Sequence, residues 1–292
     1  CGRGQDILLD LFARFIQPVQ ALCQPNRFFA FITGQQFGRK PWIANTSARV
    51  QARPQHESGM IHARNFTDPG HIAQRADAIR RGAPDCDNKY TSQVETDRLE
   101  AHFDMAAASL ITGLSQVVTV RMDKLEHHYT GLGLGEKSVH EIGHLADDKK
   151  PGRDENFADG MDGRQARAVI RTFQMELIAS LAHKLDSVPE GDGTMLDNTL
   201  IVMFSESGDN HHPSYANFPV LTLGGLGGTI RTGQYLQYPN RDSGNADQRT
   251  LGNFYTTLLH AAGQTPIDGF GQPDRKLGDA IDQAAPLAEL LV

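Results

Sequence analysis

The stretch NTLIVMFSESGDNHH, residues 198–212, joins an apolar run to an unusual polar sequence. Residues 199–204 are continuously apolar, which is typical of a parallel-sheet strand covered on both faces. The chain then places two carboxylates and two adjacent histidines within eight positions of this strand. Because ligands bind beyond the carboxyl ends of the strands in such sheets, the stretch predicts a functional site at that edge.

The elements around this strand alternate between helix and strand. Residue patterns predict helices over 92–115, 162–188 and 250–263, and further strands over 116–122 and 218–225. This order predicts an α/β fold built on a mostly parallel sheet flanked by helices. Two polar segments, 129–160 and 205–217, each follow a strand, so we expect both at the same edge of the sheet.

Residues 1–90 show little periodicity. Residues 7–23 could form an amphipathic helix broken at Pro18, and a long stretch rich in Gln, Arg and Pro follows. We therefore expect residues 1–90 to form a loop-rich N-terminal segment of uncertain fold, which is incomplete or atypical for the class. Residues 91–292 are expected to form the α/β domain.

Composition limits the classes of partner. Hydrophobic residues make up 39% of the chain, enough for a buried core, but no apolar run approaches the length of about 20 residues that spans a bilayer. The start of the sequence lacks the basic and apolar regions of a signal peptide. Residues 91–292 hold 28 acidic against 16 basic side chains, which argues against nucleic acid as a partner and suits cation binding. Three irregularly spaced cysteines predict neither a disulfide framework nor a zinc ribbon.

The polar sequence after residue 204 offers metal ligands. Carboxylates and neutral imidazoles bind zinc, manganese and iron, and a carboxylate at a strand end is held rigidly. A serine here would act as a nucleophile only beside a base or a metal. The alternative is a polar turn around Gly208. The candidate residues are Ser205, Glu206, Ser207, Asp209, His211 and His212.

A second candidate is the sequence HEIGH, residues 140–144. It matches the His-Glu-x-x-His pattern of zinc metalloproteases, in which two histidines bind the metal and the Glu is the general base. That pattern requires a stable, continuous helix, whereas this one lies in a Gly-rich segment with Pro151 shortly after it. A protease using His140, Glu141 and His144 therefore stays an alternative. A third candidate, His128 in the sequence EHHY (126–129), could contact a ligand or substrate, or could lie in a solvated loop.

The sequences PEGDGTMLDNTLIVMFSESGDNHH, FPVLTLGGLGGTIRTGQYLQYP and TLGNFYTTLLHAAG resemble a family of exported bacterial proteins defined by a domain of unknown function. That family is described as a remote relative of the alkaline phosphatase and sulfatase superfamily. The resemblance covers roughly residues 92–272. It implies an alkaline phosphatase-like fold, a periplasmic or secreted location, and a divalent metal site beyond the carboxyl edge.

The resemblance also implies roles for individual residues. A late strand of the superfamily ends in Ser/Thr-Asp-His-Gly, where this chain has Ser205-Glu206-Ser207-Gly208, so Glu206 replaces the metal-binding Asp. His211 or His212 occupies the position of a later metal-binding histidine. His140 and His144 replace an earlier Asp-x-x-x-His pair. No residue of this chain matches the superfamily's nucleophile.

These observations predict a metal-dependent hydrolase that acts on a small-molecule phosphate or sulfate ester. The expected metal is zinc. Its expected ligands are His140, His144, Glu206 and His212. Glu141, Ser205, Ser207, Asp209, His211 and His128 are expected around the metal or the substrate. Two alternatives are an exported domain that keeps the fold without catalysis and the His-Glu-x-x-His metalloprotease.

Overall fold

A computed structural model describes the chain over residues 28–34, 89–124, 126–146, 157, 160–205, 218–239, 245–264, 269–275, 277 and 280–292. For residues 28–34 and for Asp123 only the backbone is described. The helix predicted over 7–23 lies outside these ranges.

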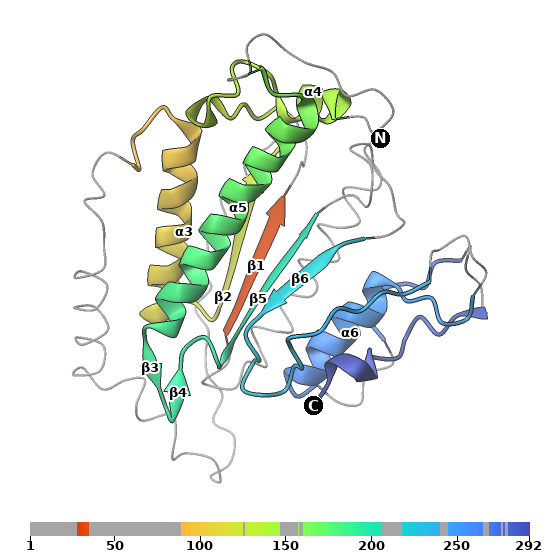
Figure 1. The fold of residues 1–292 in the computed structure, drawn as a ribbon. Coiled ribbons are helices and arrows are strands. Elements are labelled where there is room, and N and C mark those ends of the chain that lie inside the picture. Colours follow the sequence, from red (N-terminus) through yellow and green to blue (C-terminus); the bar gives the residue numbers. More distant parts are fainter. Residues whose placement is uncertain are drawn as a thin grey trace.

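Within the described residues, four strands form the central sheet (Figure 1). They are β1 (Phe28–Gly34), β2 (Val117–Asp123), β5 (Thr199–Ser205) and β6 (Val220–Leu223), in the spatial order β2-β1-β5-β6. β1 pairs in parallel with both β2 and β5, whereas β6 runs antiparallel to β5. β1 is therefore hydrogen-bonded along both of its sides.

The carboxyl ends of β1, β2 and β5 meet at one edge of the sheet. Gly34, the last residue of β1, lies opposite Asp123 of β2 and opposite Ser205 of β5. The chain segments that leave β2 and β5 consequently start at the same edge, on either side of the end of β1. This register agrees with the expectation that the polar segments 129–160 and 205–217 begin at the same edge.

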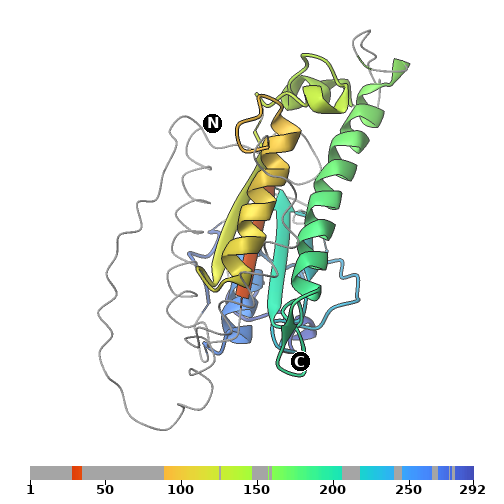
Figure 2. The same ribbon diagram turned by 90° about the vertical axis from the view of Figure 1, so that its left-hand side faces the viewer.

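Helices cover both faces of the sheet. α3 (Glu95–Ile111) and α5 (Gly163–Asp186) lie next to one another on one face, with their axes roughly along the strands (Figures 1 and 2). α6 (Leu251–Ala261) packs against the other face. No described helix has both the length and the apolar character needed to cross a membrane.

The alternation of side chains along β5 shows how this strand connects the two layers. Ile201 and Met203 pack in the cluster that includes α3 and α5. Leu200, Val202 and Phe204 pack in the cluster that includes α6. Both faces of β5 are thus buried, as its uninterrupted apolar sequence predicted.

Shorter elements complete the described structure. They are η2 (Thr130–Leu132), α4 (Val139–Leu145), β3 (Pro189–Glu190), β4 (Gly193–Thr194) and η6 (Ala288–Leu290). α4 lies above the carboxyl ends of the strands and packs against the start of α5 (Figure 1). The small β3–β4 hairpin joins α5 to β5 at the opposite end.

The mixed α/β class is confirmed, and each helix predicted from residue 91 onward is present with shorter ends. The sequence analysis missed β1, which lies within the segment expected to be loop-rich. Its sequence, FFAFITG, has the aromatic and β-branched residues of a strand but no alternation and no periodic neighbours. Because β1 pairs with β2 and β5, the sheet includes a strand from before the boundary placed at residue 90.

Candidate functional site

The segment that follows β2 folds back on itself at the carboxyl edge. His128 and Ser138 form an isolated antiparallel bridge, and the Val139 N–H donates to the His127 carbonyl at 2.8 Å. These contacts close the loop between them. They place the start of α4 beside residues 126–128.

Tyr129 fastens this loop to the core. Its side chain is fully buried, and its hydroxyl accepts a hydrogen bond from Gln174 Nε2 at 3.0 Å and donates to the Met122 carbonyl at 3.4 Å. Gln174 is also fully buried and accepts from Arg171 at 2.6 Å. Because leaving one such buried group unpaired costs about 1–3 kcal/mol, the network favours a single position for the loop against α5.

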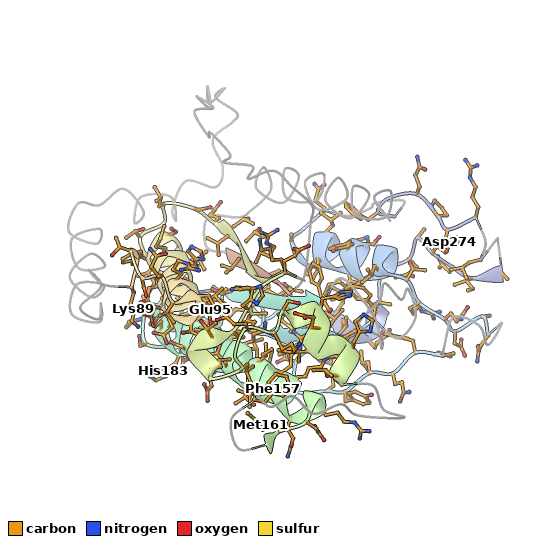
Figure 3. All side chains as sticks on the ribbon, turned by 90° about the horizontal axis from the view of Figure 1, so that it is seen from above. Lys89, Glu95, Phe157, Met161, His183 and Asp274 are labelled. Carbon is orange, nitrogen blue, oxygen red and sulfur yellow. The ribbon has the colours of Figure 1, made fainter. Side chains whose placement is uncertain are left out.

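Glu95 fastens the same loop to α3. Its carboxylate accepts from the Gly131 N–H at 2.9 Å and from the Thr130 hydroxyl at 3.0 Å, and the residue is only 5% exposed. Figure 3 looks down on the carboxyl edge and shows Glu95 on the same side of the molecule as Phe157 and Met161, with Asp274 on the opposite side. The loop is thus held from two helices before α4 begins.

A capping box starts α4. The Ser138 hydroxyl accepts from the Glu141 N–H at 3.3 Å, and the Glu141 carboxylate accepts from the Ser138 N–H at 2.9 Å. The Ser138 hydroxyl also donates to this carboxylate at 2.9 Å, and Lys137 lies 3.6 Å from it. These hydrogen bonds from Ser138, followed by the charge of Lys137, lower the pKa of Glu141 below its ordinary value.

His140 and His144 lie one turn apart on α4 and approach closely. Their Nε2 atoms are 3.0 Å apart, and the ring centroids are 4.7 Å apart with an interplanar angle of 72°. Residues four apart face the same side of a helix, so the spacing accounts for the approach. Two neutral imidazoles at this distance either share one proton in a hydrogen bond or direct two lone pairs at a common cation.

The distance between the two nitrogens fits one metal ion. Zinc–imidazole bonds are about 2.0–2.1 Å long, so nitrogens 3.0 Å apart would subtend about 95° at the metal. That angle lies close to the 90° of octahedral coordination and about 15° below the tetrahedral angle. The pair supplies only two ligands, and no group of three or more His, Cys, Asp or Glu side chains suited to a metal occurs among the described residues.

A cavity of about 450 Å³ adjoins the pair at His140. Among the described residues it is lined by Glu126, His128, Ser138, His140 and Glu141. A hydrogen bond orients the His128 ring, because its Nδ1 lies 2.7 Å from the Glu136 carbonyl oxygen. The lining therefore combines residues from the loop after β2 with the first turn of α4.

Close packing holds α4 at the amino end of α5. Gly163 is the first residue of α5, and a Cβ atom added there would lie 2.2 Å from the Leu145 carbonyl carbon and 2.4 Å from the Leu145 oxygen. Only a residue without a side chain allows the two backbones to approach so closely. This contact fixes the end of α4 that carries His144.

The structure describes some of the predicted site residues, and others lie outside the described ranges. His140 and His144 come together, and His128 and Glu141 line the cavity at His140. Ser205 ends β5 at the same edge of the sheet. The remaining predicted residues lie outside the described ranges; they are Glu206, Ser207, Asp209, His211 and His212.

Two residues of this edge were not predicted. Ser138 lines the cavity and caps α4, although the pattern Ser-x-x-Glu of a capping box was present in the sequence. Asp123 ends β2 opposite Gly34, one position beyond the predicted end of that strand. A carboxylate that ends the strand sequence VVTVRMD would have identified it as an edge residue.

Scans of protein-family models, curated proteins and solved structures found no match to this chain. The resemblance to alkaline phosphatase relatives therefore remains a prediction from the sequence.

Proposed function

We propose that this protein is a metal-dependent hydrolase of the alkaline phosphatase-like class, acting on phosphate or sulfate esters. The observation that carries the proposal is the His140–His144 pair, whose Nε2 atoms lie 3.0 Å apart. Its place beyond the carboxyl ends of parallel strands supports the proposal, because α/β sheets bind ligands there.

The proposed metal is zinc, held by His140 and His144 together with Glu206 and His212. The last two follow β5, whose carboxyl end lies at this edge. A bound divalent ion would polarise a phosphoryl or sulfuryl oxygen and lower the pKa of a bound water. Ser138 and Glu141 would keep the two imidazoles in place by fixing the first turn of α4.

The capping box weighs against the metalloprotease alternative. A protease of that type needs its Glu as a general base that faces the metal-bound water. In α4 the Glu141 carboxylate instead reaches back to the N–H and hydroxyl of Ser138. The helix also begins at Val139, one residue before the first histidine, and contains only 7 residues.

The first experiment is to measure metal content by mass spectrometry, on protein purified without chelators or affinity metals. We expect about one or more zinc ions per chain, a stoichiometry that follows from the proposed four-ligand site. The variants His140→Ala, His144→Ala and His212→Ala should each lose the ion. Loss of a supporting residue typically costs about 10–100-fold in affinity, and loss of a ligand should cost at least as much.

His183→Ala is the matched control. His183 is exposed in the last turn of α5, about 30 Å along that helix from α4, and should leave the metal content unchanged. Retention of zinc in His212→Ala, with loss of peptide hydrolysis in Glu141→Ala, would favour the protease. A folded chain without any metal would contradict both the hydrolase and the protease hypotheses and favour the non-catalytic domain.

A further inference from the structure

The cavity beside the imidazole pair contains groups that the capping box and the His pair do not use. Ser138 and Glu141 bond to each other, so their polar atoms are engaged in starting α4. Glu126 and His128 also line this cavity, from the segment just after β2. Both are exposed side chains two positions apart in the sequence.

The ring of His128 is held in one tautomer. Its Nδ1 lies 2.7 Å from the Glu136 carbonyl, which is only an acceptor, so Nδ1 must carry the hydrogen. In the neutral ring the lone pair is then on Nε2. No described residue donates a hydrogen bond to this Nε2, so a residue that lines the cavity keeps an acceptor on an oriented ring.

Glu126 adds a second acceptor of the same kind. An ionised carboxylate only accepts hydrogen bonds, and none of the described residues donates one to Glu126. Lys137 lies against Glu141, with its Nζ 3.6 Å from the Glu141 carboxylate. A ligand that satisfies both Glu126 and His128 must therefore bring hydrogen-bond donors, and a positive charge would match the carboxylate.

We propose that this cavity binds an ammonium group on the alcohol portion of the substrate, through Nε2 of His128 and the carboxylate of Glu126. The assignment to a substrate rests on the proposed hydrolase. It makes esters of amino alcohols the substrate class, in preference to esters of apolar alcohols. The binding itself needs neither turnover nor a metal.

The test uses two molecules of nearly equal size, ethanolamine and 1-propanol, which differ in an ammonium against a methyl group. The full chain, labelled with ¹⁵N-histidine and free of metal, is titrated with each at about pH 8, well above the pKa of a free histidine side chain. Long-range ¹H–¹⁵N spectra should show His128 protonated at Nδ1. Its Nε2 resonance should shift saturably with ethanolamine and less with 1-propanol.

Variants separate the cavity from the rest of the surface. His128→Asn keeps an amide donor for the Glu136 carbonyl but removes the ring acceptor, and Glu126→Gln removes the charge. Each should weaken ethanolamine binding about five- to tenfold, the equivalent of one hydrogen bond, whereas His183→Asn should leave it unchanged.

Three results would overturn the inference: a proton on Nε2 in the neutral ring, equal responses to both molecules, or unchanged affinity in both cavity variants. Because no metal is present in this test, its outcome is independent of the zinc measurement. Ethanolamine binding without any zinc binding would keep the cavity and reject the hydrolase. Zinc binding without ethanolamine binding would keep the proposed hydrolase and reject the ligand assigned to the cavity.

Discussion

Glu141 belongs to two overlapping sequence patterns, and each pattern predicts a different role for its carboxylate. In His-Glu-x-x-His the Glu is a candidate general base, and in Ser-x-x-Glu the same residue is the third helical position of a capping box. Which role applies depends on where the helix begins. Because α4 begins at Val139, the Glu141 carboxylate is drawn to the backbone of Ser138.

The capping box should make the stability of the protein depend on pH. The folded-state pKa of Glu141 is below 4.5, its ordinary value, so its stabilising effect is present above about pH 4.5 and is lost as the pH falls through the folded pKa. Ser138→Ala should reduce the free energy of unfolding by about 0.5–2 kcal/mol at neutral pH. In urea unfolding, this difference should shrink in acid.

Ser109→Ala is the control for that measurement, since Ser109 lies within α3 rather than at its start. It should change stability little at either pH. A deficit of Ser138→Ala that stays constant down to low pH would show that Glu141 is not stabilised by the box.

The junction of α4 and α5 depends on the absence of one side chain. In an ordinary helix, Gly→Ala raises helix propensity by about 1 kcal/mol. At Gly163 we expect the opposite sign, because a methyl group would meet the backbone of Leu145 at 2.2 Å. Gly163→Ala should destabilise the protein by about 1–3 kcal/mol, the usual range for overpacking, and should weaken zinc binding by displacing His144.

Thermal unfolding and zinc titration of this variant test both effects. Gly225→Ala is the matched control, because a Cβ atom there would have its nearest contact at 3.7 Å, an ordinary van der Waals distance. If Gly163→Ala were as stable as the parent protein and bound zinc equally well, the position of α4 would not depend on this contact.

The whole molecule depends on β1 in a way that its local sequence does not reveal. Its pairing with β2 and β5 joins the two strands that end at the candidate site. A chain of residues 89–292 would lack β1, which would leave β5 paired with β6 alone and β2 without a strand partner in the described sheet. We expect this shortened chain to lose the cooperative urea transition of the full chain, measured by circular dichroism.

A substitution in the full chain should reproduce the effect of that deletion. Ala30 pairs with Val118 on one side and Ile201 on the other, so Ala30→Pro should remove a backbone hydrogen bond in the central strand and cost at least about 1–3 kcal/mol, the usual penalty for a buried group left unpaired. If residues 89–292 unfolded cooperatively with the midpoint of the full chain, β1 would not be an integral strand of the sheet.

The sequence by itself determined the α/β class, the helices α3, α5 and α6, and the strands β2, β5 and β6. These follow from local patterns, since side-chain periodicity and helix caps act within one element. The spacing of His140 and His144 brings their rings together only because residues 139–145 are helical, and the sequence analysis did not predict α4. Only the tertiary structure decided the place of β1, the register of Gly34 with Asp123 and Ser205, and the close approach of Gly163 to Leu145. Strand pairing and backbone packing join residues far apart in the chain, and no local pattern specifies which distant partner a strand meets.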